Sequence, residues 1–365
     1  MRKLFALTCL LLLAAPSVRA SAIEDATQEV MTKLKQQSYN PNVRPSQDGG
    51  PTQVKLQAYI RDISVDDKKM EADIVLTFRM AWHDYRLAFS TRSVSYVNIL
   101  EPHLAWLPDA FFKNAITTQL EAIYPESYLR VFESGDIIYS TRMILKQRCP
   151  MNMASFPHDS QACVIRIASY GYTADDVNFT MTSDEVRIAN NLNIERFILE
   201  NIETSYCSSK TNTGEYSCAQ ISILLSRIFS TYLTEWYFPT FLLVIVAWFS
   251  FAIPEDQFLA RLLLTLIPLI TLSSFMNVFR KSLASVNYTR ALDVFTGIST
   301  LSLLASLVHV IVCYVRGGGE AGAGRDNLGG NTKKAKVMKY LPLVIHVCCY
   351  LLFLFVYFLV YNFAE

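Results

Sequence analysis

Residues 149–163 read CPMNMASFPHDSQAC, so thirteen residues lie between two cysteines. Near the centre, Phe156, Pro157 and Asp159 place an aromatic ring, a rigid bend and a carboxylate within four positions. A Cys149–Cys163 disulfide would close this stretch into a short loop that can move as one body. The loop is interpreted either as a projection whose aromatic and carboxylate tip packs on neighbouring helices, or as a structural staple alone.

Apart from Cys9 within residues 1–20, the remaining cysteines divide by their surroundings. Cys207 and Cys218 lie in a polar region, and their spacing predicts a second short disulfide loop. Disulfides indicate an oxidising, extracellular environment. Three further cysteines fall in apolar segments, where we expect buried small hydrophobes, and these are Cys313, Cys348 and Cys349.

The amino terminus has the pattern of a secretory signal peptide. Residues 1–20 combine early basic residues, an apolar run and small residues at the end. The apolar run is shorter than the ~20 residues that a membrane span needs, so a first transmembrane helix is the weaker alternative. A short helix is predicted next, at about Ile23 to Gln36.

The polar half, residues 21–230, has the alternation of β-strands. From Met70 to Trp82 every second residue is apolar, while Asp73, Thr77 and Arg79 take the other face. The segment Ile137 to Leu145 alternates similarly. Short strands between turn signals predict an all-β sandwich of immunoglobulin-like type.

The second half contains four apolar runs, each long enough to cross a bilayer as a helix. Residues 231–315 are predicted to hold three helices, at about 232–253, 258–279 and 291–315, and residues 340–365 the fourth helix with the carboxyl terminus. The intervening residues 316–339 carry an excess of lysine and arginine, which indicates a cytosolic loop. We therefore expect a multi-pass plasma-membrane protein with both termini extracellular.

This order of parts, together with the Phe156-Pro157-x-Asp159 loop, resembles the Cys-loop receptors, which are pentameric ligand-gated ion channels. Within that family the chain is similar to invertebrate glutamate-gated chloride channels and to glycine receptors. Residues 106–112, 168–173 and 206–218 resemble the three binding loops of one subunit face. The resemblance implies a pentamer, and a loop at Cys149 that touches the segment Arg280 to Arg290 between the second and third helices.

The resemblance also implies a ligand site between subunits for a small, neurotransmitter-like molecule such as glutamate or glycine. Aromatic faces suit an ammonium group and guanidinium groups suit a carboxylate. One subunit would supply Arg61, Thr77, Arg79, Ser140 and Arg142. Its neighbour would supply Phe111, Ser169, Tyr170, Thr213 and Tyr216. The alternative for each residue is a solvated arginine or a packed aromatic.

The second apolar segment is predicted to line the pore. Helical spacing places seven residues on one face, and these are Ala260, Leu263, Ile267, Ile270, Ser274, Asn277 and Lys281. By resemblance, Ile270 is a hydrophobic gate. Arg280 and Lys281 at the outer end favour permeant anions, whereas Leu263, Ile267 and Pro268 predict a dry inner pore and a broken hydrogen bond or a kink.

Other functions are disfavoured by the sequence. The net charge is +1, without a basic stripe for nucleic acid. Neither a catalytic motif nor metal-ligand spacing occurs, so no enzyme, cofactor or metal is expected. Asn178-Phe179-Thr180 is a candidate glycosylation site. The leading hypothesis is a chloride-selective receptor subunit with a postsynaptic location. The alternatives are a ligand-binding or auxiliary subunit that conducts poorly, and a cation channel.

Overall fold

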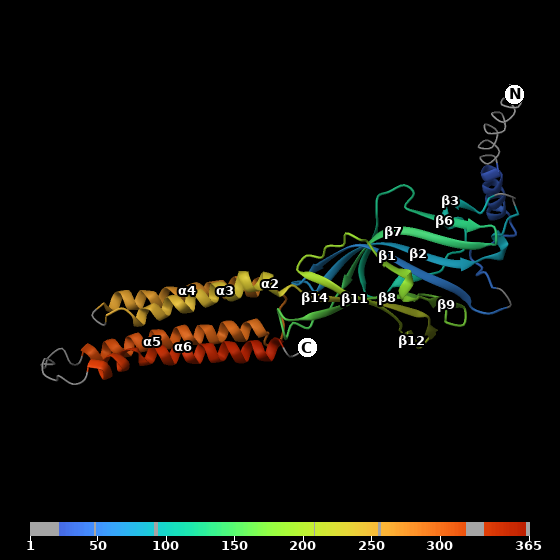
Figure 1. The fold of residues 1–365 in the computed structure, drawn as a ribbon. Helices are drawn as coiled ribbons and strands as arrows, with labels where there is room; N and C mark the ends of the chain where they lie inside the picture. The colour runs from blue at the N-terminus through green and yellow to red at the C-terminus, as the bar shows by residue number, and fades with distance from the viewer. Residues whose placement is uncertain are drawn as a thin grey trace, which may run out of the picture.

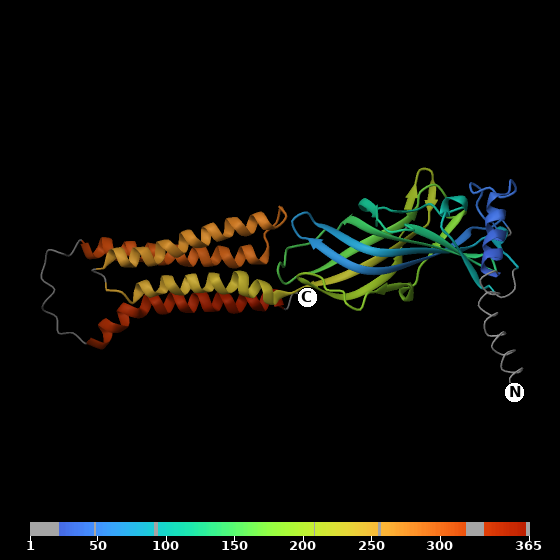
Figure 2. The same cartoon turned by 90° about the horizontal axis from the view of Figure 1, so that it is seen from above.

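The computed structural model consists of a β-rich part and a bundle of four helices, arranged end to end (Figures 1 and 2). The structure describes residues 22–46, 49–90, 94–207, 209–254, 257–318 and 332–362. The predicted signal peptide lies outside these residues, as does most of the predicted cytosolic loop.

The β-rich part contains two main sheets. The larger sheet has eight strands in the order β10-β1-β2-β7-β6-β3, with β5 paired to β7 and β9 paired to β1. Its strands are β1 (Thr52–Asp66), β2 (Glu71–His83), β3 (Tyr96–Ile99), β5 (Ala115–Leu120), β6 (Ser127–Phe132), β7 (Asp136–Arg148), β9 (Val177–Thr180) and β10 (Val186–Ile188).

The smaller sheet has four strands in the order β11-β14-β8-β4. Its strands are β4 (Ala110–Phe112), β8 (Ser160–Ser169), β11 (Phe197–Tyr206) and β14 (Cys218–Arg227). A separate hairpin pairs β12 (Ser209–Thr211) with β13 (Gly214–Tyr216). The two sheets enclose one apolar core, which confirms the predicted sandwich.

Strand β2 shows how the alternating sequence builds this core. Its apolar residues from Ala72 to Trp82 are buried at every second position, while Asp73 and Arg79 are exposed. Thr77 was expected to lie on the same polar face as Arg79, yet it is only 7% exposed. Arg61 of the neighbouring strand covers it and donates a hydrogen bond from Nε to its Oγ1 at 3.1 Å. Burial of Thr77 is thus compatible with its place on the polar face.

The predicted amino-terminal helix is present over residues 22–35. Ala26, Val30 and Leu34 recur every four residues and are buried against the sandwich. This spacing places them on one face, so a single apolar stripe anchors the helix.

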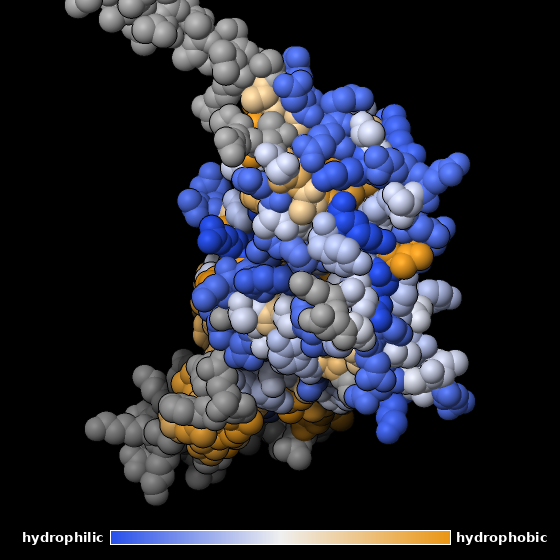
Figure 3. Space-filling model, turned by 90° about the vertical axis from the view of Figure 1, so that its right-hand side faces the viewer, coloured by the Kyte–Doolittle hydropathy of each residue, from blue (hydrophilic) through white to orange (hydrophobic). Residues whose placement is uncertain are grey.

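The four long apolar helices are present, as predicted. The segments that are long and apolar enough to span a membrane are Phe229–Phe251, Phe258–Ser282, Ala291–Val315 and Leu341–Tyr361. The first comprises α2 (Phe229–Tyr232), a π-helical turn (Leu233–Tyr237), α3 (Phe238–Trp248) and a 3₁₀ turn (Phe249–Phe251); the others lie in α4 (Phe258–Ser282), α5 (Ala291–Gly318) and α6 (Thr332–Asn362). Exposed apolar side chains cover these helices, whereas the end of the β-rich part seen in Figure 3 is mostly hydrophilic.

The start of the first helix differs from the predicted position, whereas Pro268 lies within a continuous helix, where its missing N–H agrees with the predicted broken hydrogen bond. The first helix starts at Phe229, three residues before the predicted position. The hydropathy of the sequence did not indicate these residues because the opening turn is polar. The hydroxyl of Thr234 donates a hydrogen bond to the carbonyl of Thr231 at 2.9 Å. Helix α4 continues through Pro268, which is buried against the bundle. The proline has no N–H to donate, but the helix does not end there.

Candidate functional site

A cavity of about 260 Å³ lies against the outer face of the larger sheet. It contains all five residues predicted for one subunit: Arg61, Thr77, Arg79, Ser140 and Arg142. The strand register explains this grouping, since Arg79 lies opposite Ser140 and Thr77 lies opposite Arg142 in the β2–β7 pair. Arg61 occupies the irregularity between Ile60 and Asp62 of β1. An extra residue at such a bulge redirects its side chain, here toward the cavity.

The three arginines of this cavity differ in their partners. Arg142 lies 2.8 Å from Glu121, measured from Nε to Oε2. Arg61 donates to Thr77, and its guanidinium lies 4.9 Å from the centre of the Tyr59 ring. Arg79 has neither an ion pair nor a side-chain hydrogen bond among the residues that the structure describes. Arg79 is therefore the guanidinium most available to an external carboxylate.

Arg79 also borders a second cavity of about 470 Å³, which sequence reasoning missed. Lys55 and Arg187 line this cavity together with Asp184 and Glu185. Lys55 and Glu185 form an ion pair. Sequence reasoning also missed Glu121, the partner of Arg142, because it lies in the connection after β5, where no alternating pattern marks a face.

The aromatic residues predicted for the other subunit face lie along the smaller sheet. The rings of Phe111 and Tyr170 meet edge to face with centroids 5.7 Å apart. Tyr170 is 79% exposed, so most of its ring is open to a ligand. Ser169, by contrast, is buried beneath them.

Asp109 organises this aromatic face. Its carboxylate accepts hydrogen bonds from the Ser169 hydroxyl at 2.7 Å and from the backbone N–H groups of Tyr170 at 3.0 Å and Tyr172 at 3.2 Å. Several donors on one carboxylate fix the loop that carries Tyr170. Asp109 lies within residues 106–112, which resemble a binding loop, but the sequence indicated no role for this residue.

The β12–β13 hairpin carries the last two predicted residues. Its base is pinned by the Cys207–Cys218 disulfide, with the Cα atoms 4.9 Å apart. The hydroxyl groups of Thr213 and Tyr216 are 2.9 Å apart and exposed. Gly214 has φ +144°, and a Cβ atom there would lie 3.1 Å from Thr173. The glycine thus permits both the turn and its close approach to the loop beside Tyr170.

The two predicted sets lie on different sheets and do not share a cavity within one chain. Each set by itself would supply only half of the predicted ligand site. The arginine set offers charge but no exposed aromatic pair, and the aromatic set offers rings but no guanidinium. A complete site would need the second set from another copy or a related chain.

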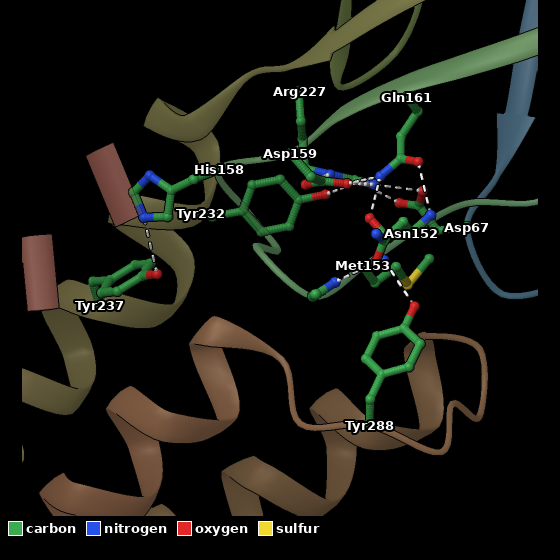
Figure 4. Close-up of polar contacts among 11 residues, drawn as sticks. Asp67, Asn152, Met153, His158, Asp159, Gln161, Arg227, Tyr232, Tyr237 and Tyr288 are labelled. Carbon is green, nitrogen blue, oxygen red and sulfur yellow. Dashed lines mark hydrogen bonds and ion pairs between the residues drawn. The ribbon is translucent and has the colours of Figure 1, made fainter. Parts of the chain in front are cut away.

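The Cys149 loop joins the β-rich part to the helices. Cys149 and Cys163 form a disulfide with Cα atoms 5.1 Å apart. The backbone N–H of Met153 donates to the Tyr288 hydroxyl at 2.8 Å (Figure 4). The N–H groups of Ala291 and Leu292, at the start of α5, donate to the carbonyls of Ala154 at 2.9 Å and Phe156 at 3.1 Å. The loop therefore meets the connection between α4 and α5, as expected.

The tip of this loop is not arranged as expected, because its carboxylate does not pack on the helices. Phe156 does, with ring centroids 5.0 Å from Tyr232 and 5.9 Å from Phe279. Asp159 turns inward and accepts from Arg227 Nε at 2.7 Å. An ionised carboxylate needs a partner when it is buried, and Arg227 at the end of β14 supplies one.

Arg227 forms a buried cluster with two carboxylates (Figure 4). Besides Asp159, it donates from Nη1 to Asp67 Oδ2 at 2.8 Å and to the Tyr232 hydroxyl at 3.1 Å. Its side chain is 0% exposed. Burial by itself lowers the pKa of Arg227, but the hydrogen bonds that it donates to both carboxylates raise it above its ordinary value. The cluster ties three separate segments together.

Comparisons with known proteins concern the two predicted residue sets and the Cys149 loop. Residues 27–229 match the neurotransmitter-gated ion-channel ligand binding domain. A glutamate-gated chloride channel of Drosophila melanogaster is 37% identical over 307 residues, which are 82% of this chain and 67% of the fly protein. The chain belongs to the Cys-loop receptors. Members of this family bind neurotransmitters and assemble as pentamers that ions permeate, and the chain is a ligand-gated channel subunit rather than an enzyme.

In this Cys-loop receptor, helix α4 has one face that other helices of the subunit cover and one that they leave open. Arg261, Thr265, Pro268 and Leu272 are buried. The predicted pore residues Leu263, Ile267, Ile270, Ser274, Asn277 and Lys281 are exposed, whereas Ala260 is half-buried. Arg261 donates to the carbonyl of Ser250 at 3.1 Å, so the inner basic residue stays within the subunit.

Other candidate positions of the receptor have local partners. Asn178 on β9 is half-buried; its Nδ2 donates to Gln53 at 3.2 Å and its Oδ1 accepts from Ser217 at 3.2 Å. Use of Asn178 for glycosylation stays a prediction. No group of three metal-ligating side chains occurs within the described ranges.

Proposed function

We propose that this chain forms a pentameric channel in which a small amino-acid-like ligand, bound between neighbouring subunits, opens an anion-selective pore. The observation that carries the proposal is Arg79, an exposed guanidinium that has no ion pair within the described part of the chain and lines the same cavity as four other predicted ligand residues. Charge-assisted, bidentate pairing with a carboxylate is the strongest contact such a group can make.

The two half-sites suggest how a zwitterion would be held. Its carboxylate would pair with Arg79, assisted by Arg61, on one subunit. Its ammonium would lie against the rings of Tyr170 and Tyr216 on the neighbour, where cation–π attraction is available. The exposed hairpin tip would then close over the ligand.

Ligand binding must favour the open pore to act as a signal. The supporting path runs from the hairpin down β14 to Arg227, and from there through Asp159 to the Cys149 loop. That loop contacts the first turn of α5 and Tyr288. Movement of the smaller sheet would in this way reach the end of the pore helix.

Anion selectivity is supported by charge at the outer end of α4 and by the sequence at its inner end. Arg280 and Lys281 are exposed, and no glutamate adjoins Ala260 and Arg261. The Drosophila relative named above is a chloride channel. We further propose extracellular termini and a place in the postsynaptic membrane for the assembled receptor.

The deciding experiment is whole-cell recording from the chain expressed alone, with glutamate, glycine and γ-aminobutyrate applied in turn while external chloride is varied. The proposal expects a ligand-evoked current that reverses at the chloride equilibrium potential. A current that follows the sodium potential would establish the cation-channel alternative instead. Silence from pentamers that reach the surface would reject homomeric conduction.

A second function is favoured by the pore face itself: a receptor or auxiliary subunit that binds ligand but conducts poorly alone. Leu263, Ile267 and Ile270 are 44%, 56% and 57% exposed, which leaves three successive turns of the open face apolar. A narrow pore lined by such rings closes by dewetting. The double substitution Leu263→Thr and Ile267→Thr should produce ligand-dependent current if the pore is merely dry, and none if the subunit has only a binding role.

A further inference from the structure

A cavity of about 330 Å³ lies at the outer ends of helices α4 and α5, apart from the ligand half-sites. Its polar walls are formed by Arg280, Ser285, Tyr288, Thr289, Arg290 and Asp293. It is formed within one subunit. The helices on which it rests are long and apolar enough to span a membrane, so the cavity lies at the level where lipid headgroups meet the protein.

The cavity has more positive than negative charge. Arg290 Nε donates to Asp293 Oδ2 at 2.8 Å, and Arg280 Nε lies 3.9 Å from Asp293 Oδ1. Two guanidinium groups therefore share one carboxylate. The side chain of Arg280 is 63% exposed, so its hydrogen-bonding groups are available to a ligand.

Arg290 is incompletely satisfied. Its side chain is only 6% exposed, and its Nη1 atom is buried without a hydrogen-bond partner among the described residues. Its guanidinium also lies 5.1 Å from the centre of the Phe279 ring, which holds it in place but accepts no strong hydrogen bond. A buried charged donor without an acceptor is costly, and an anion in the cavity could offset that cost after a small shift of the side chain.

We propose that this cavity binds a phosphate group, supplied by an outer-leaflet lipid headgroup or by free phosphate. Phosphate matches the donors present: the exposed guanidinium of Arg280, the Nη1 atom of Arg290, and the hydroxyls of Ser285 and Thr289. Tyr288 forms part of the wall and holds Met153 of the Cys149 loop (Figure 4). Occupancy of the cavity thus stiffens the contact between the β-rich part and the helices.

The test is the thermal unfolding midpoint of the purified full-length receptor in neutral detergent, titrated separately with dihexanoyl phosphatidic acid, dihexanoylglycerol and inorganic phosphate. The expected result is a dose-dependent rise with phosphatidic acid and none with dihexanoylglycerol, which lacks the phosphate. A rise with inorganic phosphate as well identifies the phosphate group itself as sufficient. A rise with phosphatidic acid alone identifies a lipid headgroup, and a rise with inorganic phosphate alone identifies free phosphate.

Arg280→Gln removes one charged donor from an exposed position and should weaken phosphate binding about tenfold. Lys281→Gln is the matched control, since it removes the same charge from the next residue, which does not line the cavity. The proposal is overturned if neither phosphate compound raises the midpoint, if dihexanoylglycerol acts like phosphatidic acid, or if the two variants bind equally. Because no current is measured, the result is independent of whether the channel conducts.

Discussion

Arg79 and Arg227 show two opposite uses of the same side chain. Arg227 is fully buried and pairs with Asp67 and Asp159, so its guanidinium nitrogens all have acceptors within the protein. Arg79 is exposed, borders two cavities and has no ion pair within the described part of the chain. An arginine whose donors are all paired within the protein thus holds segments together, whereas an arginine with unpaired donors at a cavity is available to a ligand.

The largest expected effect is that of Arg227→Met. It leaves two carboxylates buried without a counter-charge, which costs about 3–5 kcal/mol, and the receptor should fail to reach the cell surface. Surface biotinylation checks this. Arg166→Met is the control, because Arg166 is exposed and, among the residues that the structure describes, its side chain hydrogen-bonds only to Gln220, at 3.0 Å. Normal surface expression of Arg227→Met would show that the cluster is dispensable.

Arg79→Ala should have the reverse profile. Folding and assembly should be retained, because the substitution removes an exposed side chain that has no ion pair within the described part of the chain. Affinity for a carboxylate ligand should fall at least 10- to 100-fold. Equilibrium binding to purified receptors, together with size-exclusion chromatography, measures both. Arg130→Ala is the control, since Arg130 stacks on Tyr96 at 4.4 Å outside both cavities. Unchanged affinity would remove the carboxylate clamp from the proposal.

Asp109→Asn tests a residue that both holds protein segments together and adjoins the proposed ligand site. Its carboxylate accepts hydrogen bonds that hold a loop, and it lies beside the aromatic residues predicted to contact the ligand. The amide keeps the shape but loses the charge, so the bonds from Tyr170 and Tyr172 weaken by about 1–2 kcal/mol in total. Ligand affinity should fall several-fold with a small drop in the unfolding midpoint. A normal affinity would mean that the loop is held by its strand alone.

The smallest effect concerns pH at the junction. Burial lowers the pKa of His158, with a smaller opposing effect from Asp159, and the ring stacks on Phe229 at 4.4 Å. The unfolded chain then binds the proton more tightly than the folded one. Stability is full above about pH 6.5 and is lost as the pH falls from there toward the lowered pKa.

His158→Phe should remove that part of the acid sensitivity while keeping the stacking. Unfolding midpoints of wild type and variant at pH 7.5 and 5.5 measure it. Equal losses in both proteins would show that other groups control the acid response.

Much of the fold follows from periodicity. The alternation in β2 predicts which side chains face the core, and the same alternation places Thr77 beside Arg79 and Ser140 beside Arg142. Length and hydropathy suffice for the four helices. Alternation thus accounts for two pairs of the arginine half-site, whereas Arg61 and the grouping of all five residues followed from the family resemblance, and their role as a ligand site stays a proposal.

The rest depends on contacts between distant segments. Asp67 and Arg227 are 160 residues apart, and neither lies in a pattern that indicates a partner. Glu121 lies in a connection without periodicity, so its approach to Arg142 could not be anticipated. Asp159 shows the same limit, because its motif indicates a tip residue while burial beside Arg227 decides its direction.

The carbonyl groups of Ala154 and Phe156 serve as the amino-terminal cap of α5, since they accept from its first two N–H groups. A helix cannot satisfy these donors itself. If the Cys149 loop moves only part of the way to a new position, both N–H groups lose their acceptors without gaining others. Intermediate positions of the loop are therefore higher in free energy. The contact between the Cys149 loop and α5 is therefore expected to adopt discrete positions rather than a continuous range. Opening of the pore would then be an all-or-none event.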